Sequence, residues 1–530
     1  ILLKSKTIIG IGSPRASLES NFALRKLVGQ ENFYSGMSAQ EHELAALIID
    51  ILAKGPARTP SLHDVETADA VLVLGEDVTN TAPMLALALR QAVRNKPKET
   101  ATAMRIPTWD DSAVRNLIQD ESGPLYLATA ADTRLDDTAT KAWHAAPNDI
   151  ARLGFAIAHE LNQNAPAVPG LSGDVRSFIY EAAKALQNAR RPLIVSGASL
   201  GSEALILAAA NVAWALCENG KQAELCYTFP ECNSMGLGLM RGENVKDLLD
   251  GQREIDTIII LENDLYRRTD KNAIDNLLSR AKNSIVIDHL LNTTSSKADV
   301  ILPAGTFAEA EGTLVNNEGR AQRFYQVLVP QGDIQESWKW IRDIMNSAAK
   351  SAKIWQSFND ISNDMIAAFP LFNPIKDIAP SADFRIRGEK IPRQPHRYSG
   401  RTAMLANVTL HEPKPPEDPD SPLSFSMEGY GGQPPAPLIS RYWSPGWNSV
   451  QALNKFQQEV GGSLRGGDPG GRLIEPAPGG KPAYFTAMAA VAPGEKTLPQ
   501  HRIFGSEELS MYSPAIAEMA GIRLSKENKP

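Results

Sequence analysis

Apolar residues along this chain of 530 residues form short continuous runs, and stretches with helical periodicity lie between them. Three of the runs are Val71 to Leu74, Leu193 to Ser196 and Thr257 to Leu261. Continuous runs of this length are typical of parallel strands that are covered on both faces. Because strands and helices take turns, the pattern predicts an α/β fold with parallel, Rossmann-like sheets. Further strands are predicted near Leu125 to Ala128, Ser284 to Asp288 and Val300 to Leu302, and helices over Asp149 to Leu161, Val175 to Asn188, Glu203 to Cys217 and Asn272 to Ala281.

The first strand, turn and helix follow one another near the start of the sequence. Ser17 is a good helix N-cap residue and follows a strand that ends near Gly10. A glycine turn at this place can hold a phosphate on its backbone N–H groups. A lone G-x-G is weak support for that function, and we expect Gly10 and Gly12 to allow close packing of helix on strand. In the next unit, Thr81 or a neighbour is expected to cap a helix that has Pro83 in its first turn.

From about residue 396 the chain becomes rich in proline and glycine, and no periodicity persists to about residue 482. Such a composition is typical of a flexible linker. Four aromatic residues favour instead an extended arm that packs against a partner, because solvated linkers avoid large aromatic side chains. These partner-packing candidates are Tyr442, Trp443, Trp447 and Phe456.

Charge and composition exclude several classes of protein. A net charge of −7 without a block of Lys and Arg argues against nucleic-acid binding. No run approaches the roughly 18 apolar residues that cross a bilayer, so direct membrane insertion is not expected. Cys217, Cys226 and Cys232 are too few for a four-cysteine cluster. The eight histidines follow no metal-binding spacing, so no metal is predicted, although the acidic segment EPKPPEDPDSP has a composition compatible with Ca²⁺.

The stretch from Ala298 to Phe324 predicts a polar loop at a strand's end, where open α/β sheets bind their ligands. Glu309 and Glu311 would share one face if they lay on a strand. They could act as general acid and base, but we favour a bracing role in which they accept backbone N–H groups. Arg320 and Arg323 could bind an anion or pair with the carboxylates of the loop. The residues expected to line this cleft and to hold the loop by mutual hydrogen bonds are Glu309, Glu311, Asn316, Glu318 and Arg320.

A formal G-x-S-x-G motif surrounds Ser199, between a predicted strand and a predicted helix. In α/β-hydrolases this context presents a nucleophilic serine, with an acid and a histidine later in the chain. Asp264 or Asp288, together with His289, could complete such a set. We favour a simple glycine-permitted turn, because short motifs match by chance.

Three segments together resemble the molybdopterin oxidoreductases. ADVILPAGTFAEAEGTLVNNEGRAQRF, at residues 298–324, looks like the strand of the ADVVLP type and the E-x-E-G-T and N-x-E-G-R loop of that family. GSPRASLESNFALRKLVG at 12–29 resembles the family's helix that enters the active-site region, and ADAVLVLGEDVTNTAPMLALALRQAVRN at 68–95 resembles its next Rossmann-like unit. The sequences of these segments are most similar to those of the large iron–sulfur subunits of bacterial respiratory NADH:quinone oxidoreductases (complex I). RYWSPGWNSVQALNKF at 441–456 looks like the enterobacterial type of these subunits.

The departures from the family pattern concern its active site. Active members place a cysteine, selenocysteine, serine or aspartate on molybdenum just after the helix that here ends at Gly29. This chain has no cysteine there, and only Ser35 or Ser38 can be proposed by position. Where catalytic formate dehydrogenases carry an arginine, this chain has Phe229 and Pro230 nearby. The resemblance therefore implies the family fold with a degenerate site that is not catalytic.

The resemblance implies a structural role in the peripheral arm of complex I, where electrons pass from NADH toward quinone. No catalytic residue and no cofactor is then expected in this portion, and molybdenum least of all. The implied iron–sulfur clusters lie on an N-terminal part that this sequence lacks and on partner subunits. The implied partners are flavin- and NADH-binding, iron–sulfur and quinone-site connecting subunits at the cytoplasmic side of the bacterial inner membrane. The alternative is a large fragment of an active molybdopterin oxidoreductase such as a formate dehydrogenase.

The family's interleaved domains predict how the chain divides. Residues 1–40 and 226–345 are expected to form one discontinuous domain, with 41–225 inserted as a second. Residues 346–400 are expected to be helical and linker, and 401–530 to be a C-terminal extension. The chain begins at Ile1 and without the features of a signal peptide, so we expect it to be cut from a longer protein.

Overall fold

A computed structural model describes residues 5–108, 110–119, 121–251, 253–348, 354–378, 470–476, 480 and 483–485. The chain divides into two compact units, and each unit is built from stretches that are separate in the sequence. The first unit comprises Ile1–Tyr34, Gly251–Asn316 and Arg320–Leu473. The second comprises Ser35–Asp250, Asn317–Gly319 and Ile474–Pro530.

The first unit contains a five-stranded parallel sheet with the strand order β10-β9-β8-β1-β2. Its strands are β1 (Ile8–Ile11), β2 (Phe33–Tyr34), β8 (Ile255–Leu261), β9 (Ala281–Asp288) and β10 (Val300–Pro303). Strand β8 is almost wholly buried, whereas the edge strand β10 is partly exposed. Proline closes β10, where its missing N–H costs the ladder nothing. The switch in strand order falls between β1 and β8, so ligand-type loops are expected at their carboxyl ends.

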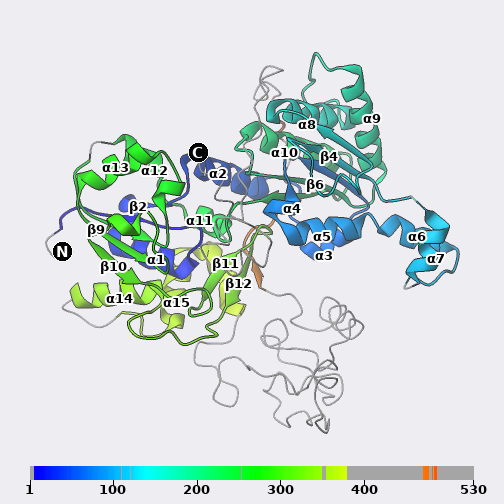
Figure 1. Ribbon diagram of the computed structural model, residues 1–530. Coiled ribbons are helices and arrows are strands. Elements are labelled where there is room, and N and C mark those ends of the chain that lie inside the picture. The colour runs from blue at the N-terminus through cyan, green and yellow to red at the C-terminus, as the bar shows by residue number, and fades with distance from the viewer. Residues whose placement is uncertain are drawn as a thin grey trace, which may run out of the picture. The chain divides into compact units, whose positions relative to one another are not determined.

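Four α-helices and a small antiparallel sheet complete the described part of the first unit (Figure 1). They are α1 (Leu18–Val28), α13 (Lys271–Arg280), α14 (Ser337–Ala348), α15 (Phe358–Ala368), the 3₁₀ turns Gln30–Asn32, Leu265–Arg267, Ser295–Lys297 and Pro370–Asp377, and the strands β11 (Gly312–Val315), β12 (Arg320–Phe324) and β13 (Gly471–Arg472). Ser17 caps α1 as predicted, because its side chain accepts the N–H of Ser20. A Cβ at Gly10 would lie 2.9 to 3.0 Å from side-chain atoms of Leu24 and Val28, so glycine lets α1 pack closely on β1.

The second unit is a doubly wound sheet with the strand order β5-β4-β3-β6-β7, all parallel. Its strands are β3 (Ala70–Leu74), β4 (Leu125–Thr129), β5 (Lys141–His144), β6 (Pro192–Gly197) and β7 (Glu224–Thr228). The sheet lies between two helical layers (Figure 1). One face packs on α3 (Leu62–Glu66), α4 (Val78–Thr81) and α5 (Pro83–Ala92) through a core of small aliphatic residues.

The opposite face packs on α8 (Pro147–Leu161), α9 (Gly173–Asn188) and α10 (Glu203–Glu218). Tyr126 on β4 meets Phe178 on α9 edge to face, with their ring centroids 5.6 Å apart. Helix α10 is buried along nearly its whole length, in keeping with its largely apolar sequence. The remaining helices are α2 (Ala39–Lys54), α6 (Asn95–Ala103), α7 (Asp111–Ile118), α11 (Ser234–Met240) and α12 (Val245–Asp250).

These sheets confirm the predicted α/β class. Pro83 is the first residue of α5, as predicted, and the N-cap position is taken by Ala82, a neighbour of Thr81, without a side-chain capping hydrogen bond. Glu309 lies in a turn and Glu311 directly precedes β11, so the condition under which they would share one face of a strand is not met.

The observed division into units differs in its limits from the predicted one. The chain passes between units after residues 34 and 250, whereas the prediction placed these limits after 40 and 225. Strand β7 pairs with β6, which extends the inserted unit beyond residue 225. The predicted arm and its aromatic candidates Tyr442, Trp443, Trp447 and Phe456 lie outside the described residues, as does most of the predicted C-terminal extension.

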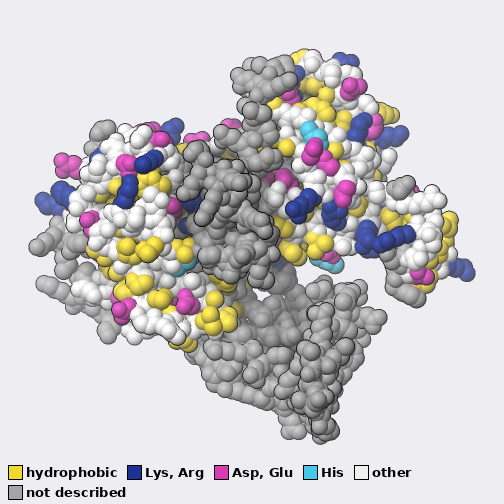
Figure 2. Space-filling view, viewed as in Figure 1, with side chains coloured by type: hydrophobic (Ala, Val, Ile, Leu, Met, Phe, Trp, Pro, Cys, Tyr) yellow, Lys and Arg dark blue, Asp and Glu magenta, His cyan; other side chains and the backbone are white. Residues whose placement is uncertain are grey.

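The described surface carries mixed charge. Figure 2 shows Lys, Arg, Asp and Glu side chains interspersed over the face in view. Among the helices that the structure describes, none has the length and apolar character needed to cross a bilayer. All three cysteines are free thiols, and burial raises the pKa of Cys226 to about 12.

Candidate functional site

The glycine turn after β1 is filled by a side chain of its own helix. Asn21 on α1 is fully buried and accepts the N–H of Ser13 at 2.9 Å. Its amide donates to the carbonyl oxygens of Ser13, Ala16 and Ser17 at 2.9 to 3.2 Å. A Cβ at Gly12 would lie 2.4 Å from the Asn21 oxygen. The turn therefore uses its polar groups to pack α1, which favours the packing interpretation over phosphate binding.

A buried carboxyl group lies beside this turn at the end of β8. Glu262 has a φ of 41°, a left-handed value that side chains rarely adopt. Its carbonyl oxygen accepts the Ser13 hydroxyl at 2.8 Å and the Arg15 guanidinium at 3.0 Å. Its carboxyl oxygen accepts the Ser337 hydroxyl at 2.5 Å. Burial raises the pKa of Glu262, and the nearby His289 opposes that shift.

The loop between β10 and β12 is closed by short-range hydrogen bonds. Glu309 accepts the N–H and the hydroxyl of Thr306 at 3.0 and 2.9 Å, which caps a turn. The side-chain oxygen of Asn316 accepts the backbone N–H of Arg320 at 3.1 Å, and the backbone N–H of Asn316 donates to the carbonyl oxygen of Arg320. The Glu318 carboxylate, which belongs to the second unit, accepts the N–H of Leu62 at 3.1 Å. These predicted cleft residues thus brace turns, and Asn316 and Arg320 bond each other directly.

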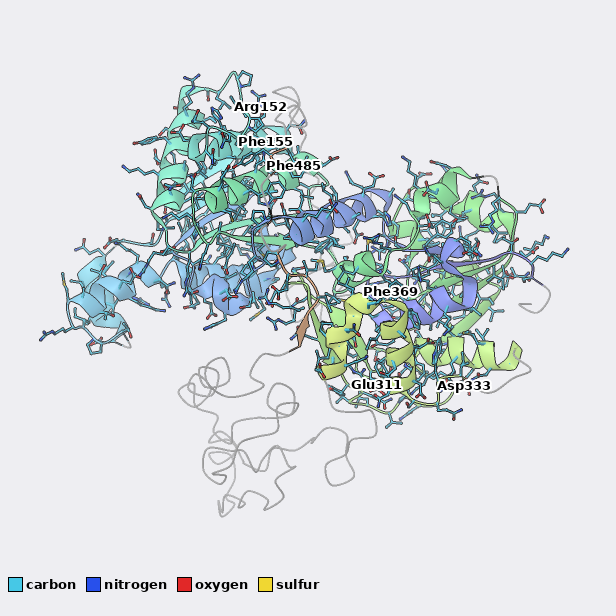
Figure 3. All side chains as sticks on the ribbon, turned by 180° about the vertical axis from the view of Figure 1, so that it is seen from behind. Arg152, Phe155, Glu311, Asp333, Phe369 and Phe485 are labelled. Carbon is cyan, nitrogen blue, oxygen red and sulfur yellow. The ribbon has the colours of Figure 1, made fainter. Side chains whose placement is uncertain are left out.

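A buried ionic network connects β11 and β12 to α1 in the first unit. Arg323 donates to Glu311 at 3.0 Å and lies 4.0 Å from the carboxylate of Glu19 (Glu311 is labelled in Figure 3). Glu19 is fully buried and accepts the N–H and hydroxyl of Thr313 at 2.8 and 2.7 Å. Burial raises the pKa of Glu19, and Arg323 and Thr313 offset part of that effect. The guanidinium carbon of Arg323 also lies 3.4 Å from the centroid of the Phe358 ring.

Glu19 was not among the residues predicted for this site. An acidic residue in the first turn of a helix ordinarily interacts with the helix dipole and solvent. Here Glu19 and Thr313 are 294 positions apart in sequence, and only the fold brings them together. The pattern around residue 19 carried no signal for such a contact, apart from the unusual burial that the apolar neighbours Leu18 and Phe22 suggest.

In the second unit, the two serines proposed by position have internal partners. Ser38 is the N-cap of α2 and accepts the N–H of Glu41 at 3.2 Å. Ser35 is buried, and its hydroxyl lies 3.0 Å from Nδ1 of His42. Burial lowers the pKa of His42. Both hydroxyl groups are thus engaged by groups of the same unit.

Ser199 bonds a carboxyl group and not a histidine. Its hydroxyl donates to Glu76 at 2.8 Å, at the switch point between β3 and β6. Burial raises the pKa of Glu76, which Thr81, Ser199 and Thr228 partly offset. Asp264, Asp288 and His289, the proposed triad partners, belong to the first unit. Asp264 there caps a 3₁₀ turn, and within the second unit the hydrogen-bond partner of the Ser199 hydroxyl is Glu76.

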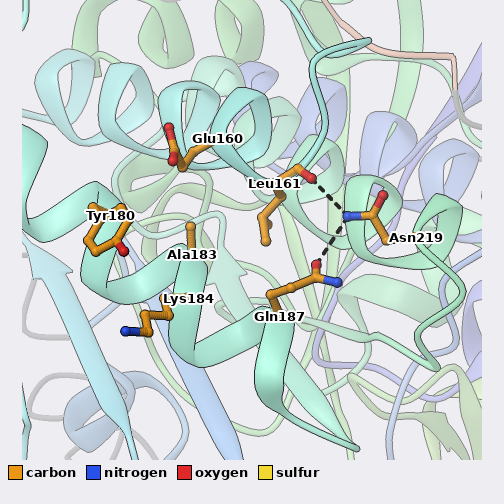
Figure 4. A pocket seen from close by; sticks show the side chains of 7 residues that line it. All are labelled: Glu160, Leu161, Tyr180, Ala183, Lys184, Gln187 and Asn219. Atoms are coloured by element: carbon orange, nitrogen blue, oxygen red, sulfur yellow. Dashed lines mark hydrogen bonds between the residues drawn. The ribbon is translucent and has the colours of Figure 1, made fainter.

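An open pocket of about 500 Å³ lies between α8, α9 and the end of α10 (Figure 4). Asn219 donates to the Leu161 carbonyl at 2.8 Å and to Gln187 at 3.1 Å on one side of it. No nucleophile and base pair occurs among its lining residues, which are Glu160, Leu161, Tyr180, Ala183, Lys184, Gln187 and Asn219.

Two interleaved units, each built on a parallel sheet with a switch in strand order, define a doubly wound α/β protein. Residues 3–347 match the family model for molybdopterin oxidoreductase, so the chain belongs to that family. The resemblance seen in the motifs is confirmed.

Its relatives narrow the assignment within the family. The chain is 48% identical over 98% of its length to the G subunit of NADH-quinone oxidoreductase from Pseudomonas fluorescens. It is 47% identical over 97% of its length to the protein of that name from Salmonella typhimurium, and 45% identical over 97% to that of Escherichia coli. The chain spans 58% of the length of each of these relatives. A chain of the formyltransferase/hydrolase complex of Methylorubrum extorquens, at 14% identity and a TM-score of 0.44 over 66% of this chain and 92% of that one, is too distant to carry an argument.

Proposed function

We propose that this chain is the molybdopterin-type portion of a G subunit of NADH-quinone oxidoreductase, and that it serves as a scaffold in the peripheral arm of respiratory complex I. The observation that carries the proposal is identity of 45–48% over nearly the whole chain to three proteins of that name. The alignments to these relatives cover 97–98% of the chain and so include most of the proline-rich C-terminal region, whereas the family model ends at residue 347.

The contacts within each unit support a structural role without turnover by this chain. Ser35 is engaged with His42, and the turn after β1 is filled by Asn21. Within the segment that resembles the family's cofactor wall, Arg323 and Glu311 pair with each other. Side chains that would face a cofactor are thus used to join helices and strands. We expect electron transfer to run through iron–sulfur clusters on other parts of the full subunit and on its partners.

The proposed setting is an assembly of several subunits at the cytoplasmic side of the bacterial inner membrane. The partners would be the flavin- and NADH-binding subunit, iron–sulfur subunits and the subunits that connect to the quinone site. Within this chain, the two α/β units would provide surfaces for docking, and the region of Tyr442, Trp443, Trp447 and Phe456 would add a partner-packing arm.

The test is affinity purification of the full subunit, tagged, from native membranes. We expect recovery of a flavin-containing arm that oxidises NADH, and recovery as a free monomer would contradict the proposal. Ser35→Ala should leave the NADH:quinone rate per assembled complex unchanged. Loss of that rate in fully assembled complexes would show that this chain takes part in turnover.

Elemental analysis separates the scaffold from the active-enzyme alternative. We expect molybdenum and tungsten far below one atom per chain. A stoichiometric amount of either metal would favour a working molybdopterin enzyme such as a formate dehydrogenase.

A deletion tests the partner-packing region. Removing residues 411–466, which spares β13, should lower recovery of the flavin-containing arm of the complex. Normal assembly after this deletion would refute the proposal that the region packs against a partner.

A further inference from the structure

A histidine and two aspartates meet at the carboxyl edge of the second sheet, on different strands from Ser199 and Glu76. His144 is the last residue of β5, while Asp132 and Asp136 lie in the loop that follows β4. Nε2 of His144 lies 2.8 Å from Oδ2 of Asp136 and 3.2 Å from Oδ1 of Asp132. Within the described residues, this is the group of three such side chains whose ligand atoms all lie within 4.8 Å of one another.

The hydrogen bonds of Thr129 determine how His144 presents its ring. The Thr129 hydroxyl donates its proton to the carbonyl oxygen of Ala131 at 2.9 Å. The same oxygen lies 3.0 Å from Nδ1 of His144, so it can only accept there, and Nδ1 carries the proton. The neutral ring therefore directs the lone pair of Nε2 toward the two carboxylates. Three electron-rich groups facing one point require a positive charge between them, either a metal ion or a proton on Nε2.

Asp136 is oriented in the same manner as the histidine. Its Oδ1 accepts the N–H and the hydroxyl of Thr133 at 3.0 and 2.7 Å, which leaves Oδ2 directed at His144. Fixing the far side of a ligand by a second hydrogen bond is the usual arrangement around protein-bound metals. Asp132 is held less firmly, because 93% of its side chain is exposed, and it can adjust its distance.

The separations of these atoms fit a small divalent ion. Atoms that bind one Zn²⁺ at about 2.0 to 2.1 Å lie about 2.8 to 3.4 Å apart for ligand angles of roughly 90° to 110°. The distances from His144 to Asp136 and Asp132, 2.8 and 3.2 Å, fall in that interval. One imidazole and two carboxylates suit Zn²⁺ better than Ca²⁺ or Mg²⁺, which prefer oxygen alone.

We propose that Asp132, Asp136 and His144 form a Zn²⁺ site in which the remaining side of the ion is open to water. The order of ligands, D-x3-D-x7-H, matches no familiar spacing, which is why the sequence did not reveal it. The ligands come together because β5 pairs in parallel with β4, with His144 opposite Thr129. The competing explanation is an imidazolium ion that pairs with two carboxylates and binds no metal.

The test titrates Zn²⁺ into the full 530-residue chain in competition with a chromophoric zinc chelator, with the thiols alkylated beforehand. We expect one high-affinity equivalent per chain. His144→Gln and Asp136→Asn should each weaken binding at least ten-fold. Asp132→Asn should weaken Zn²⁺ binding about ten-fold. Because the side chain of Asp132 is exposed, this loss cannot be attributed to a disturbed fold. Thr129→Val, which removes the partner of Nδ1, should cost about ten- to 100-fold.

Asp137→Asn is the matched control, since Asp137 lies next to Asp136 in sequence but pairs with Arg90 at 3.0 Å. Its Zn²⁺ affinity should equal that of the unchanged chain. Co²⁺ gives a second reading, a visible absorption band that appears with one equivalent and is lost in His144→Gln. Equal affinity in the Asp132→Asn and unchanged chains, or no stoichiometric binding at all, would overturn the site and leave the imidazolium pair.

Discussion

Replacement of Arg323 by methionine tests the buried network that joins α1 to the hairpin of β11 and β12. The change keeps an unbranched apolar stem, although a shorter one, and removes the cation that lies 3.0 Å from Glu311 and 4.0 Å from Glu19. Both carboxylates are at least nine-tenths buried. Leaving a buried charge without its partner typically costs about 3 to 5 kcal/mol. We expect a loss in the free energy of unfolding of that size at pH 8.

The pH dependence of this loss follows from the pKa of Glu19. Burial raises that pKa, so between the unfolded value near 4.5 and the folded value the folded chain binds more protons than the unfolded chain. Stability therefore falls as the pH rises through this interval, by up to about 1.4 kcal/mol per unit. Without Arg323 the pKa of Glu19 rises further. The loss in the variant should therefore be smaller at pH 5 than at pH 8.

Local hydrogen exchange of residues 312–324, followed by mass spectrometry, measures the free energy of opening in this hairpin. Arg342→Met is the control, because Arg342 also lies 5.5 Å from the Trp338 ring but pairs with the more exposed Asp343. That change should cost less than about 1 kcal/mol. The variant that combines Arg323→Met with Gln at positions 19 and 311 should recover most of the stability. A loss below about 1 kcal/mol, or one that does not depend on pH, would refute the reasoning.

Three further predictions concern other sites. Glu76→Gln should change the free energy of unfolding by less than about 1 kcal/mol at neutral pH. Because burial raises the pKa of this carboxyl, its contribution to stability falls as the pH rises, and the variant should lack that pH dependence, which denaturant titrations at two pH values check. Asn211→Ala should cost about 1 to 3 kcal/mol and speed proteolysis near Phe485, whose N–H and carbonyl both bond the Asn211 amide (Phe485 is labelled in Figure 3). Gly12→Ala should destabilise by about 1 to 3 kcal/mol in thermal melts, whereas Gly173→Ala, whose Cβ would meet nothing within 4 Å, should not.

Most of the strands that could be predicted from the sequence are buried on both faces, and the edge strand β10 was predicted from its short apolar run and the proline that ends it. The runs at Val71, Leu193 and Thr257 became central strands because a parallel strand between two helical layers needs apolar residues at every position. Strand β5 was missed, since Lys141–His144 alternates and occupies an edge. The pairing order of the strands was also beyond reach, because it depends on contacts between residues far apart in the sequence.

The same limit applied to the candidate site. The polar loop at 298–324 was recognised as unusual because Glu, Asn and Gly cluster there after a strand. The partners of its charges were not predictable, since Glu19 lies nearly 300 residues away and its apolar neighbours resemble those of any core helix. His144 was passed over for a related reason, because its acidic partners come from a loop and follow no helical or hairpin spacing.

The strand order of the first sheet has a consequence for synthesis on the ribosome. Ile8 pairs with Thr257, so β1 gains its inner neighbour only after the whole inserted unit has been translated. At about 5 to 20 residues per second, that takes roughly 12 to 50 seconds. During this time the edge of β1 that will pair with β8 has unpaired backbone N–H and C=O groups, and such an edge can promote aggregation. The nascent chain would therefore depend on a chaperone or on early folding of the inserted unit, and slow codons within residues 35–250 would lengthen the risk.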